Sequence, residues 1–588
     1  MNVVTLLKKI SDKGARIQRS GGELVIDAPE DSQLDDVIDE VRKSKDEIIA
    51  FLKGRSSLGV ENVFEVSPAQ QRMLYFDSSS AHNSAMYNLL FCYEVRGELD
   101  LVALRSAVNR CINRHDILRT KYAYGDSHWV QLVDPAIAVN HESTVYRYED
   151  LANRDNVESV LQERISLEQS RKFDLENEWP IRVLVLRKSS SEYVLCFVFH
   201  HIAVDGWSSK IIVRDLREAY VSYIDGTDEI DETEHKVVQY GEYAKWCENE
   251  ERLTESREYW VNHLSQLPVC HEICTDRNRP SLFEEKTSSL HKYVSKDVEN
   301  KIGELAAKYS TTNFVIYQFC FSVLLYRFSG CTDISFGTLV ANRNSRKYLN
   351  TVGLFVNTLV LRRRVDPSES IARALETAKR IYHQAIKHQS YPFDALVEEL
   401  NPVRSQSFHP LVQIMLGVQE NNTAEFDLPG VSVDVLDVDE PNSPFDLSLD
   451  IKLSKHGAEF HWCYNTALFN ASTIETMASC FERLVHSLLE KPDGNVFELD
   501  VLSERERHQQ LIEWNDTRVD YPHELCIHEL FEQQVARSPE ATAVQFGEER
   551  LSYQQLNEKS NQLAHYLVTE RGVVPDTLVG LCVERSVE

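Results

Sequence analysis

The apolar run YVLCFVF, from Tyr193 to Phe199, stops abruptly at two adjacent histidines, His200 and His201. A continuous apolar run of this length predicts a β-strand that is buried on both faces. Because successive side chains of a strand point to opposite faces, His200 and His201 cannot share one environment. We expect His201, which is nearer the following turn, to face a cleft, and His200 to lie inward with its imidazole hydrogen-bonded.

The two histidines are followed by Asp205 and Gly206 in the order His-His-x-x-x-Asp-Gly. A metal site would need a carboxylate or a third imidazole at an established spacing, and a serine hydrolase would need a Gly-x-Ser-x-Gly turn; neither fits this segment. Two satisfied core histidines are the simplest alternative, but this combination at a strand end is more typical of a ligand-facing site. Asp205 is suited to an ion pair that fixes the turn, and Gly206 leaves room for a ligand near the backbone.

The chain has 588 residues, which is too many for one hydrophobic core, so two to four domains are expected. Its formal net charge of −29 repels phosphate backbones and anionic lipids, which argues against nucleic acid or membrane surfaces as the main partners. No apolar stretch approaches the roughly 20 residues of a spanning helix, and the N-terminus lacks a signal pattern. We therefore expect a cytoplasmic protein with reduced thiols, and Cys270 and Cys274 as loop cysteines rather than zinc ligands.

The first 54 residues have a pattern of their own. A helical period runs from Val3 to Ile10, two short strand patterns flank Gly21 and Gly22, and a further helical pattern follows as one helix or two. The predicted order is α-β-β-α(α). A lone hairpin has unpaired edges, so an extended peptide from another chain could add to it as a strand. The alternative is a subdomain that merely packs on its neighbour.

From Val63 to Lys491, helical and strand patterns alternate without a repeat at solenoid periods, which predicts α/β or α+β structure in more than one lobe. Residues 55–62 are expected to form a flexible joint, and residues 500–517 a polar connector. Beyond the connector, a strand pattern and an amphipathic helix begin a last domain that is cut short at Glu588.

The middle of the chain resembles the condensation domains of nonribosomal peptide synthetases. HHIAVDG (His200–Gly206) matches the core motif of that family, and other stretches resemble its remaining signatures in the same order and at fitting distances. These stretches are SPAQQRMLYF (Ser67–Phe76), RHDILRT (Arg114–Thr120), YGEYAKW (Tyr240–Trp246, with Glu242 where Asp is usual), VGLFVNTLVLR (Val352–Arg362), HQSYPFDALV (His388–Val397) and HPLVQIML (His409–Leu416).

The two ends of the chain resemble other parts of such synthetases. GARIQRSGGELVIDAPE (Gly14–Glu30) is similar to N-terminal docking domains of the tubulysin-synthetase type, and LSYQQL (Leu551–Leu556) is similar to the first signature of adenylation domains. The predicted division is a docking domain at 1–54, a linker at 55–62, a condensation domain at 63–491 with an N-lobe at 63–234 and a C-lobe at 235–491, a linker at 492–525, and a truncated adenylation domain at 526–588.

The resemblance implies a chloramphenicol acetyltransferase-like fold, in which two lobes form a V around a tunnel. It implies amide formation between a donor acyl or peptidyl thioester and an acceptor aminoacyl thioester, with no intrinsic cofactor. Both substrates would arrive on 4′-phosphopantetheine arms of carrier domains. The implied partners are these donor and acceptor carrier domains, a downstream adenylation domain, and an upstream synthetase subunit whose C-terminal linear motif binds the docking domain. The motif wording favours an L-configured donor.

The resemblance also implies roles for single residues. The catalytic candidates are His201, Asp205 and Gly206, and the supporting candidates are His200, Ser208, Arg343 and Asn357. Asp205 would point away from the tunnel and pair with an arginine, for which Arg343 in VANRNSR is the best match. Asn357 would lie in a segment that lines the tunnel. Whether His201 acts as a base or positions the substrates stays open.

Two other functions are compatible with the histidine motif. An epimerisation domain has the same fold, but it normally follows a carrier domain and would not precede the start of an adenylation domain. A noncatalytic platform that recruits other proteins also has this fold, but such platforms usually lose the motif, whereas His201, Asp205 and Gly206 are intact here.

Overall fold

The structure is a computed structural model that describes most of the chain. Contacts within the chain define two units, Met1–Ser503 and Glu504–Glu588, and each is described by itself. The residues outside the description are 1–2, 14, 21–22, 29–33, 56–58, 61, 79–84, 86, 126–127, 137–144, 228–236, 248–252, 285, 421–425, 437–442 and 588.

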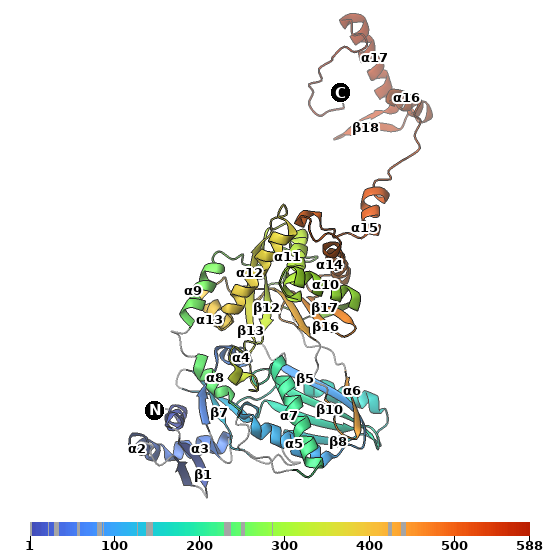
Figure 1. Cartoon of the computed structure of the whole chain (residues 1–588). Helices are drawn as coiled ribbons and strands as arrows, with labels where there is room; N and C mark the ends of the chain where they lie inside the picture. The colour runs from blue at the N-terminus through green and yellow to red at the C-terminus, as the bar shows by residue number, and fades with distance from the viewer. Residues whose placement is uncertain are drawn as a thin grey trace. The chain divides into compact units, whose positions relative to one another are not determined.

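The N-terminal elements follow the predicted α-β-β-α(α) order, with two helices at the end (Figure 1). They are α1 (Val3–Asp12), β1 (Arg16–Ser20), β2 (Glu23–Asp27), α2 (Asp35–Lys43) and α3 (Lys45–Arg55). Strands β1 and β2 pair antiparallel, from Arg16 opposite Asp27 to Ser20 opposite Glu23. The turn that we predicted at Gly21 and Gly22 lies outside the described residues.

The N-terminal elements share a core with the body that follows. Strand β3 (Gly59–Val60) pairs with β1, which gives a sheet in the order β2-β1-β3. The backbone N–H of Val63 donates to Ser11 Oγ on α1 at 3.0 Å, and apolar residues of α1 and of the following sheet belong to one cluster. The prediction of a free joint at 55–62 is therefore wrong for Gly59 and Val60, because a two-stranded hairpin gains stability from a third strand.

The N-lobe is built around a five-stranded sheet in the order β15-β5-β10-β9-β8. Helices α5 and α7 pack on one face and α6 packs on the other, so the central strand β10 is buried on both sides (Figure 1). A three-stranded sheet in the order β4-β7-β6 lies next to α1. The elements are β4 (Asn62–Glu65), α4 (Pro68–Ser78), β5 (Asn88–Gly97), α5 (Leu101–Arg114), β6 (Thr120–Tyr124), β7 (Trp129–Val133), β8 (Tyr146–Asp150), α6 (Val157–Ser170), β9 (Ile181–Arg187), β10 (Glu192–His200), α7 (Gly206–Ile224) and α8 (Tyr240–Cys247).

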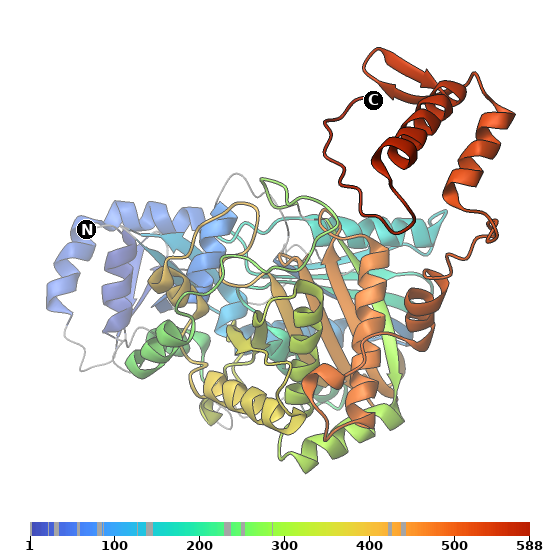
Figure 2. The same cartoon turned by 90° about the horizontal axis from the view of Figure 1, so that it is seen from above.

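The C-lobe contains a six-stranded mixed sheet in the order β11-β17-β16-β14-β12-β13. Its core lies against α10, α11, α12 and α14 (Figures 1 and 2). The elements are α9 (Thr254–His263), β11 (Thr287–Ser295), α10 (Lys296–Lys308), α11 (Asn313–Ser329), β12 (Asp333–Val340), β13 (Asn357–Arg364), α12 (Ile371–Lys387), α13 (Phe393–Leu400), β14 (Ile414–Glu420), β15 (Val431–Leu436), β16 (Leu447–Ser454), β17 (Gly457–Asn465) and α14 (Ala471–Glu490).

Three segments beyond residue 234 pack into the N-lobe rather than the C-lobe. Strand β15 pairs with β5 of the N-lobe sheet. Helix α8 and the connection between β12 and β13 both contribute side chains to the N-lobe core, among them Tyr240 and Phe355. The predicted boundary between residues 234 and 235 did not include this exchange. Segments that follow the boundary return to the first lobe and complete its apolar core.

The second unit is a small α/β fragment. Its elements are α15 (Glu504–His508), α16 (Ile527–Arg537), β18 (Thr542–Phe546), β19 (Glu549–Ser552) and α17 (Tyr553–Arg571). Strands β18 and β19 pair antiparallel, and α17 begins at Ser552 with a capping box to Gln555. Across the described part of both units, no helix has the length and apolar character needed to cross a membrane.

Candidate active site

The histidine turn lies at the end of the central strand of the N-lobe. Strand β10 ends at His200, pairs with β5 and β9 along its length, and packs its apolar side chains against both layers of helices. The backbone N–H of His201 donates to the carbonyl of Tyr87 at 2.8 Å. This strand end is therefore held rigidly, and a site that must place a side chain accurately requires such rigidity.

His200 lies inward with its ring enclosed. It is 3% exposed, its Nδ1 accepts a hydrogen bond from the N–H of Ile202 at 3.1 Å, and its ring lies edge-on to Phe173. Burial lowers its pKa to about 3, and the nearby cation of Arg182 contributes to this lowering. His200 is thus a neutral supporting residue.

His201 differs from His200 in being partly exposed. Its Nδ1 is buried and has no hydrogen-bond partner among the described residues. Its pKa is lowered from the ordinary value, chiefly because burial disfavours the imidazolium; interaction with nearby backbone groups and the charge of Asp205 oppose this lowering, and the charge of Arg72 adds to it. The ring is consequently in the unprotonated form near neutral pH and can accept a proton.

Asp205 closes the turn by capping α7. Its Oδ1 accepts a hydrogen bond from the N–H of Ser208 at 2.7 Å, and its Oδ2 accepts one from the N–H of Phe355 at 2.9 Å. Arg343 Nη2 lies 3.3 Å from Oδ1 of Asp205, and both side chains are 2% exposed. The structure therefore brings Asp205 and Arg343 together, with the carboxylate directed into the protein rather than toward solvent.

Arg343 connects the turn to the long connection between β12 and β13. Its Nη1 donates to the carbonyls of Tyr348 and Thr351, each at 2.6 Å, and its guanidinium lies 4.0 Å from the ring centroid of Phe355. Burial lowers its pKa, and the charge of Asp205 opposes this. The side chain thus holds the C-lobe connection against the start of α7.

The hydroxyl of Ser208 is hydrogen-bonded to groups at the same junction. Its hydroxyl donates to the carbonyl of Gly353 at 2.9 Å and accepts from the N–H of Gly353 at 3.0 Å and from Arg343 Nη2 at 2.9 Å. The residue is fully buried. We predicted a hydrogen-bond donor at this position, and the structure directs that donor to the backbone of the second lobe.

Gly206 and Asn357 have contrasting surroundings. Gly206 is the exposed first residue of α7, and a Cβ added there would meet no atom within 4 Å. Asn357 is buried and uses all its polar atoms: Nδ2 donates to the carbonyls of Gln389 and Tyr391, and Oδ1 accepts from the N–H of Phe393. Asn357 therefore supports the loop that begins α13, whereas open space adjoins Gly206.

Sequence reasoning missed the residues that fix the turn from outside. Gln70 Nε2 donates to the carbonyl of Ile202 at 3.4 Å. Tyr240 donates to the carbonyl of Leu354 at 2.7 Å and is hydrogen-bonded to Ser67 Oγ at 2.9 Å. These residues belong to the SPAQQRMLYF and YGEYAKW stretches, so the resemblance to family signatures already marked them. Their roles could not be predicted, because their hydrogen-bond partners are distant in sequence.

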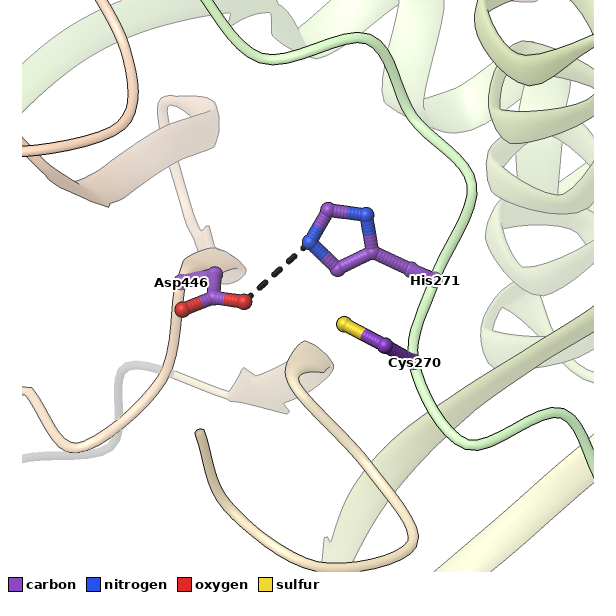
Figure 3. A group of neighbouring side chains, drawn as sticks. All are labelled: Cys270, His271 and Asp446. Atoms are coloured by element: carbon purple, nitrogen blue, oxygen red, sulfur yellow. Dashed lines mark hydrogen bonds and ion pairs between the residues drawn. The ribbon is translucent and has the colours of Figure 1, made fainter. Parts of the chain in front are cut away.

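A second group of potential ligands lies apart from the turn. The side chains of Cys270, His271 and Asp446 converge, with His271 Nε2 3.1 Å from Asp446 Oδ2 (Figure 3). Arg279 Nη2 lies 2.6 Å from Asp446 Oδ2, 3.3 Å from His271 Nε2 and 3.4 Å from Cys270 Sγ. The guanidinium therefore already supplies the positive charge that a metal ion would bring, and burial raises the pKa of the Cys270 thiol, which disfavours the thiolate.

The structure has two lobes, each with its own sheet, which are joined at the histidine turn. This architecture is that of the chloramphenicol acetyltransferase-like α/β proteins. The chain belongs to the condensation-domain family, whose model matches residues 60–511. The model of the TubC N-terminal docking domain matches residues 3–54, and that of the AMP-binding enzymes matches residues 531–588.

Curated relatives include large peptide synthetases. One of the subunits of the linear gramicidin synthase of Brevibacillus parabrevis is 33% identical over 530 residues, which cover 89% of this chain and 10% of the relative. A dimodular nonribosomal peptide synthase of Bacillus subtilis (strain 168) is 32% identical over 535 residues, which cover 88% of this chain and 22% of the relative. The chain thus spans about a tenth of the first of these relatives and about a fifth of the second.

Solved structures share the fold at lower identity. A four-domain nonribosomal peptide synthetase bound to AMP and glycine matches with a TM-score of 0.72 and 22% identity, covering 87% of this chain and 39% of that one. The condensation domain of the Monacolin K polyketide synthase matches with a TM-score of 0.64 and 17% identity, covering 74% and 99%. The X-domain from teicoplanin biosynthesis matches with a TM-score of 0.65 and 22% identity, covering 74% and 97%.

Proposed function

We propose that this chain forms an amide bond between a donor acyl or peptidyl thioester and an acceptor aminoacyl thioester. Both substrates would be carried on the 4′-phosphopantetheine arms of carrier domains. The observation that carries the proposal is the partly exposed, unprotonated His201 at a turn that Asp205 and Arg343 hold between two lobes. Membership of the condensation-domain family and similarity to peptide synthetases support the same reaction.

The chemistry places modest demands on the protein. In the proposed step the acceptor nitrogen attacks the thioester carbon, the carbon–nitrogen bond forms, and the carbon–sulfur bond breaks to release the donor arm as a thiol. An α-amine has a pKa of about 7.7–8.0, so a useful fraction is neutral at cytoplasmic pH. Holding both groups in reacting geometry can contribute roughly 7–11 kcal/mol.

Three residues of the turn have proposed roles in this step. His201 accepts the proton that the attacking amine loses and returns it to the departing thiolate, or it holds the amine in position by a hydrogen bond. Gly206 leaves space for a pantetheine arm, and its N–H belongs to the first turn of α7, where intrahelical acceptors are lacking. Asp205 orients the turn and does not react.

We further propose that the donor arrives in trans through the N-terminal docking domain. Strand β1 is paired on both sides, by β2 and by β3, which leaves β2 as the longer outer strand of that sheet. The C-terminal linear motif of an upstream synthetase subunit would bind there as an added strand. The other partners would be the donor and acceptor carrier domains and the downstream adenylation domain, with the reaction in the cytoplasm, where the thiols of the carrier arms stay reduced.

A single-turnover assay tests the proposal. The protein is mixed with one carrier loaded with a donor and one loaded with an acceptor, and the joined product is measured by mass. We expect amide formation, and we expect His201→Ala to lower its rate by a large factor while the loading of both carriers is unchanged. His456→Ala, at the exposed turn between β16 and β17, is the matched control.

The same assay separates the alternatives when the residue released from each carrier is also analysed by chiral chromatography, because epimerisation leaves the mass unchanged. An epimerisation domain would invert one carrier-bound residue and yield no joined product. A recruitment platform would yield neither result; the solved complex of the teicoplanin X-domain with OxyB shows that protein bound to another protein. Near-full amide formation by His201→Ala would contradict the proposed role of the imidazole.

A further inference from the structure

A basic surface adjoins the histidine turn, although the chain as a whole is acidic. The chain has 92 acidic and 63 basic residues. Residues 206–214, at the start of α7, nevertheless contain two cations and no carboxylate, and residues 334–365, which include the connection between β12 and β13, contain no Asp or Glu. A local excess of cations in a chain of net charge −29 indicates a surface for an anionic partner.

This basic surface draws its side chains from both lobes. On α7, Trp207, Lys210 and Arg214 follow one another at intervals of three and four residues, so they lie on one face of the helix. The indole of Trp207 belongs to a residue that is 43% exposed. The basic surface consists of six exposed residues, which are Trp207, Lys210, Arg214, Arg346, Lys347 and Leu349.

Two hydrogen bonds hold the C-lobe connection beside the first two turns of α7. Trp207 Nε1 donates to the carbonyl of Leu349 at 3.0 Å, and Arg214 Nη1 donates to Oδ1 of Asn350 at 3.0 Å. The tight turn Arg346–Tyr348 directly precedes Leu349, whose N–H donates to the carbonyl of Arg346. The cations of the connection are therefore held close to those of the helix.

Most of these cations have no counterion within the protein. Arg214 is the exception, because its Nη2 donates to Oδ1 of the buried Asp215 at 2.8 Å. Among the residues that the structure describes, no carboxylate lies within ion-pair distance of Lys210, Arg346 or Lys347. The positive charge of these three side chains is therefore available to an external anion.

The basic surface starts at the turn and extends away from it along α7. Open space adjoins Gly206, the first residue of the helix, and Trp207 follows it. Arg214 is eight residues beyond Gly206, so at about 1.5 Å per residue its Cα lies about 12 Å farther along the helix axis. A 4′-phosphopantetheine arm is linear, with its thioester at one end and its phosphodiester at the other. An arm whose thioester lies at the turn would thus pass Trp207 and bring its phosphodiester to the cations.

We propose that the basic surface binds the phosphodiester of a 4′-phosphopantetheine arm, with the indole of Trp207 packed against the apolar part of that arm. Phosphate oxygens accept charge-assisted hydrogen bonds from arginine and lysine side chains. The inference rests on the proposed function, because that function supplies the arm. Donor and acceptor carriers present the same chemical group, and the kinetics described below identify the carrier that uses this surface.

Binding of the free arm tests the phosphate contact directly. The probes are 4′-phosphopantetheine and pantetheine, which differ by the phosphate, titrated into the full chain by calorimetry. The wild type should bind the phosphorylated compound about three- to tenfold more tightly, and the double variant Lys210→Gln, Arg346→Gln should lose this preference. Trp207→Ala should weaken both compounds alike. Lys301→Gln, which removes an exposed cation of α10, is the matched control and should keep the preference. Equal affinities, or no binding of either compound, in the wild type would overturn the inference.

Single-turnover kinetics test the same contact during the reaction. In the double variant, the concentration of one carrier that gives half the maximal rate should rise about three- to tenfold. The loss should disappear when an N-acetylcysteamine thioester, which has no phosphate, replaces that carrier. An equal loss with both substrates, or a lower melting temperature that accounts for it, would overturn the inference. Phosphate-dependent binding in a protein that forms no amide would leave this inference standing and refute the proposed function.

Discussion

Arg343 and Asp205 form an ion pair at 3.3 Å in which both side chains are 2% exposed, although Asp205 precedes α7 in the N-lobe and Arg343 follows β12 in the C-lobe. The carboxylate also caps α7 through Ser208 and accepts from the N–H of Phe355. One side chain therefore ends the histidine turn, starts a helix and joins two lobes.

Replacing Asp205 should destabilise the whole protein. Asp205→Ala would leave the buried guanidinium of Arg343 without its counterion, which costs roughly 3–5 kcal/mol. We expect less soluble, folded protein, a lower melting temperature and lost activity. Asp205→Asn, which keeps an acceptor oxygen for the cap, should lose less stability than Asp205→Ala. Melting of Asp205→Ala at the wild-type temperature would count against this account.

The hydroxyl of Ser208 should matter for stability rather than for substrate binding. Ser208→Ala removes two buried hydrogen bonds with the backbone of Gly353 and a partly buried one with Arg343, at a cost of about 1–3 kcal/mol. Ser209→Ala, whose hydroxyl is exposed, should change stability by less than about 0.5 kcal/mol. Denaturant unfolding measures both, and equal midpoints for the two variants would refute the expectation.

Gly353 should tolerate no side chain. A Cβ at this position would lie 2.0 Å from Cδ2 of Tyr240, a fully buried ring whose hydroxyl bonds to Leu354 and Ser67. Gly353→Ala should therefore cost about 1–3 kcal/mol through overpacking. In Gly303→Ala on α10 the new methyl meets no atom within 4 Å, so a stabilising effect of up to about 1 kcal/mol is expected from helix propensity. Thermal melts of both variants provide the comparison.

Acid should destabilise the fold through His200. Its pKa falls to about 3 in the folded protein, whereas an unfolded histidine titrates near 6.5. The unfolded chain therefore binds more protons between these values, so this contribution to stability is present above about pH 6.5 and is lost as the pH falls toward 3. The loss at pH 5 amounts to roughly 2 kcal/mol.

His200→Asn provides the comparison for this pH dependence. The amide oxygen keeps an acceptor for the N–H of Ile202 but cannot ionise in this range. Urea unfolding at pH 5 and pH 7 should show a smaller difference for the variant than for the wild type. An identical difference in the two proteins would exclude His200 as its source.

Local sequence patterns predicted much of the fold. The run from Tyr193 to Phe199 predicted strand β10, since a strand covered on both faces favours a short continuous apolar stretch, and the structure confirms it. The order of the N-terminal elements and the two-lobed α/β class are confirmed as well. These features depend on residues that are neighbours in sequence, or on the order in which motifs follow one another along the chain.

Contacts between distant segments could not be predicted from local sequence patterns. The pairing of β15 with β5 and of β3 with β1 has no local signal, because any strand with a free edge can pair with another. Arg72 and Asp394 both lie in stretches that resemble family signatures, yet neither stretch indicates the charge of its partner. Asn357 was expected to lie in a segment that lines the tunnel, and the sequence did not indicate that its polar atoms support the start of α13.

The sequence by itself determined the family, the order of the elements and the identity of the residues at the histidine turn, because periodicity and motif spacing are properties of the linear chain. Only the tertiary structure decided which backbone groups Asp205 and Ser208 bind, and which segments of the second lobe complete the core of the first. Burial and electrostatic interaction depend on distances in space, and folding brings together residues that the chain itself keeps far apart.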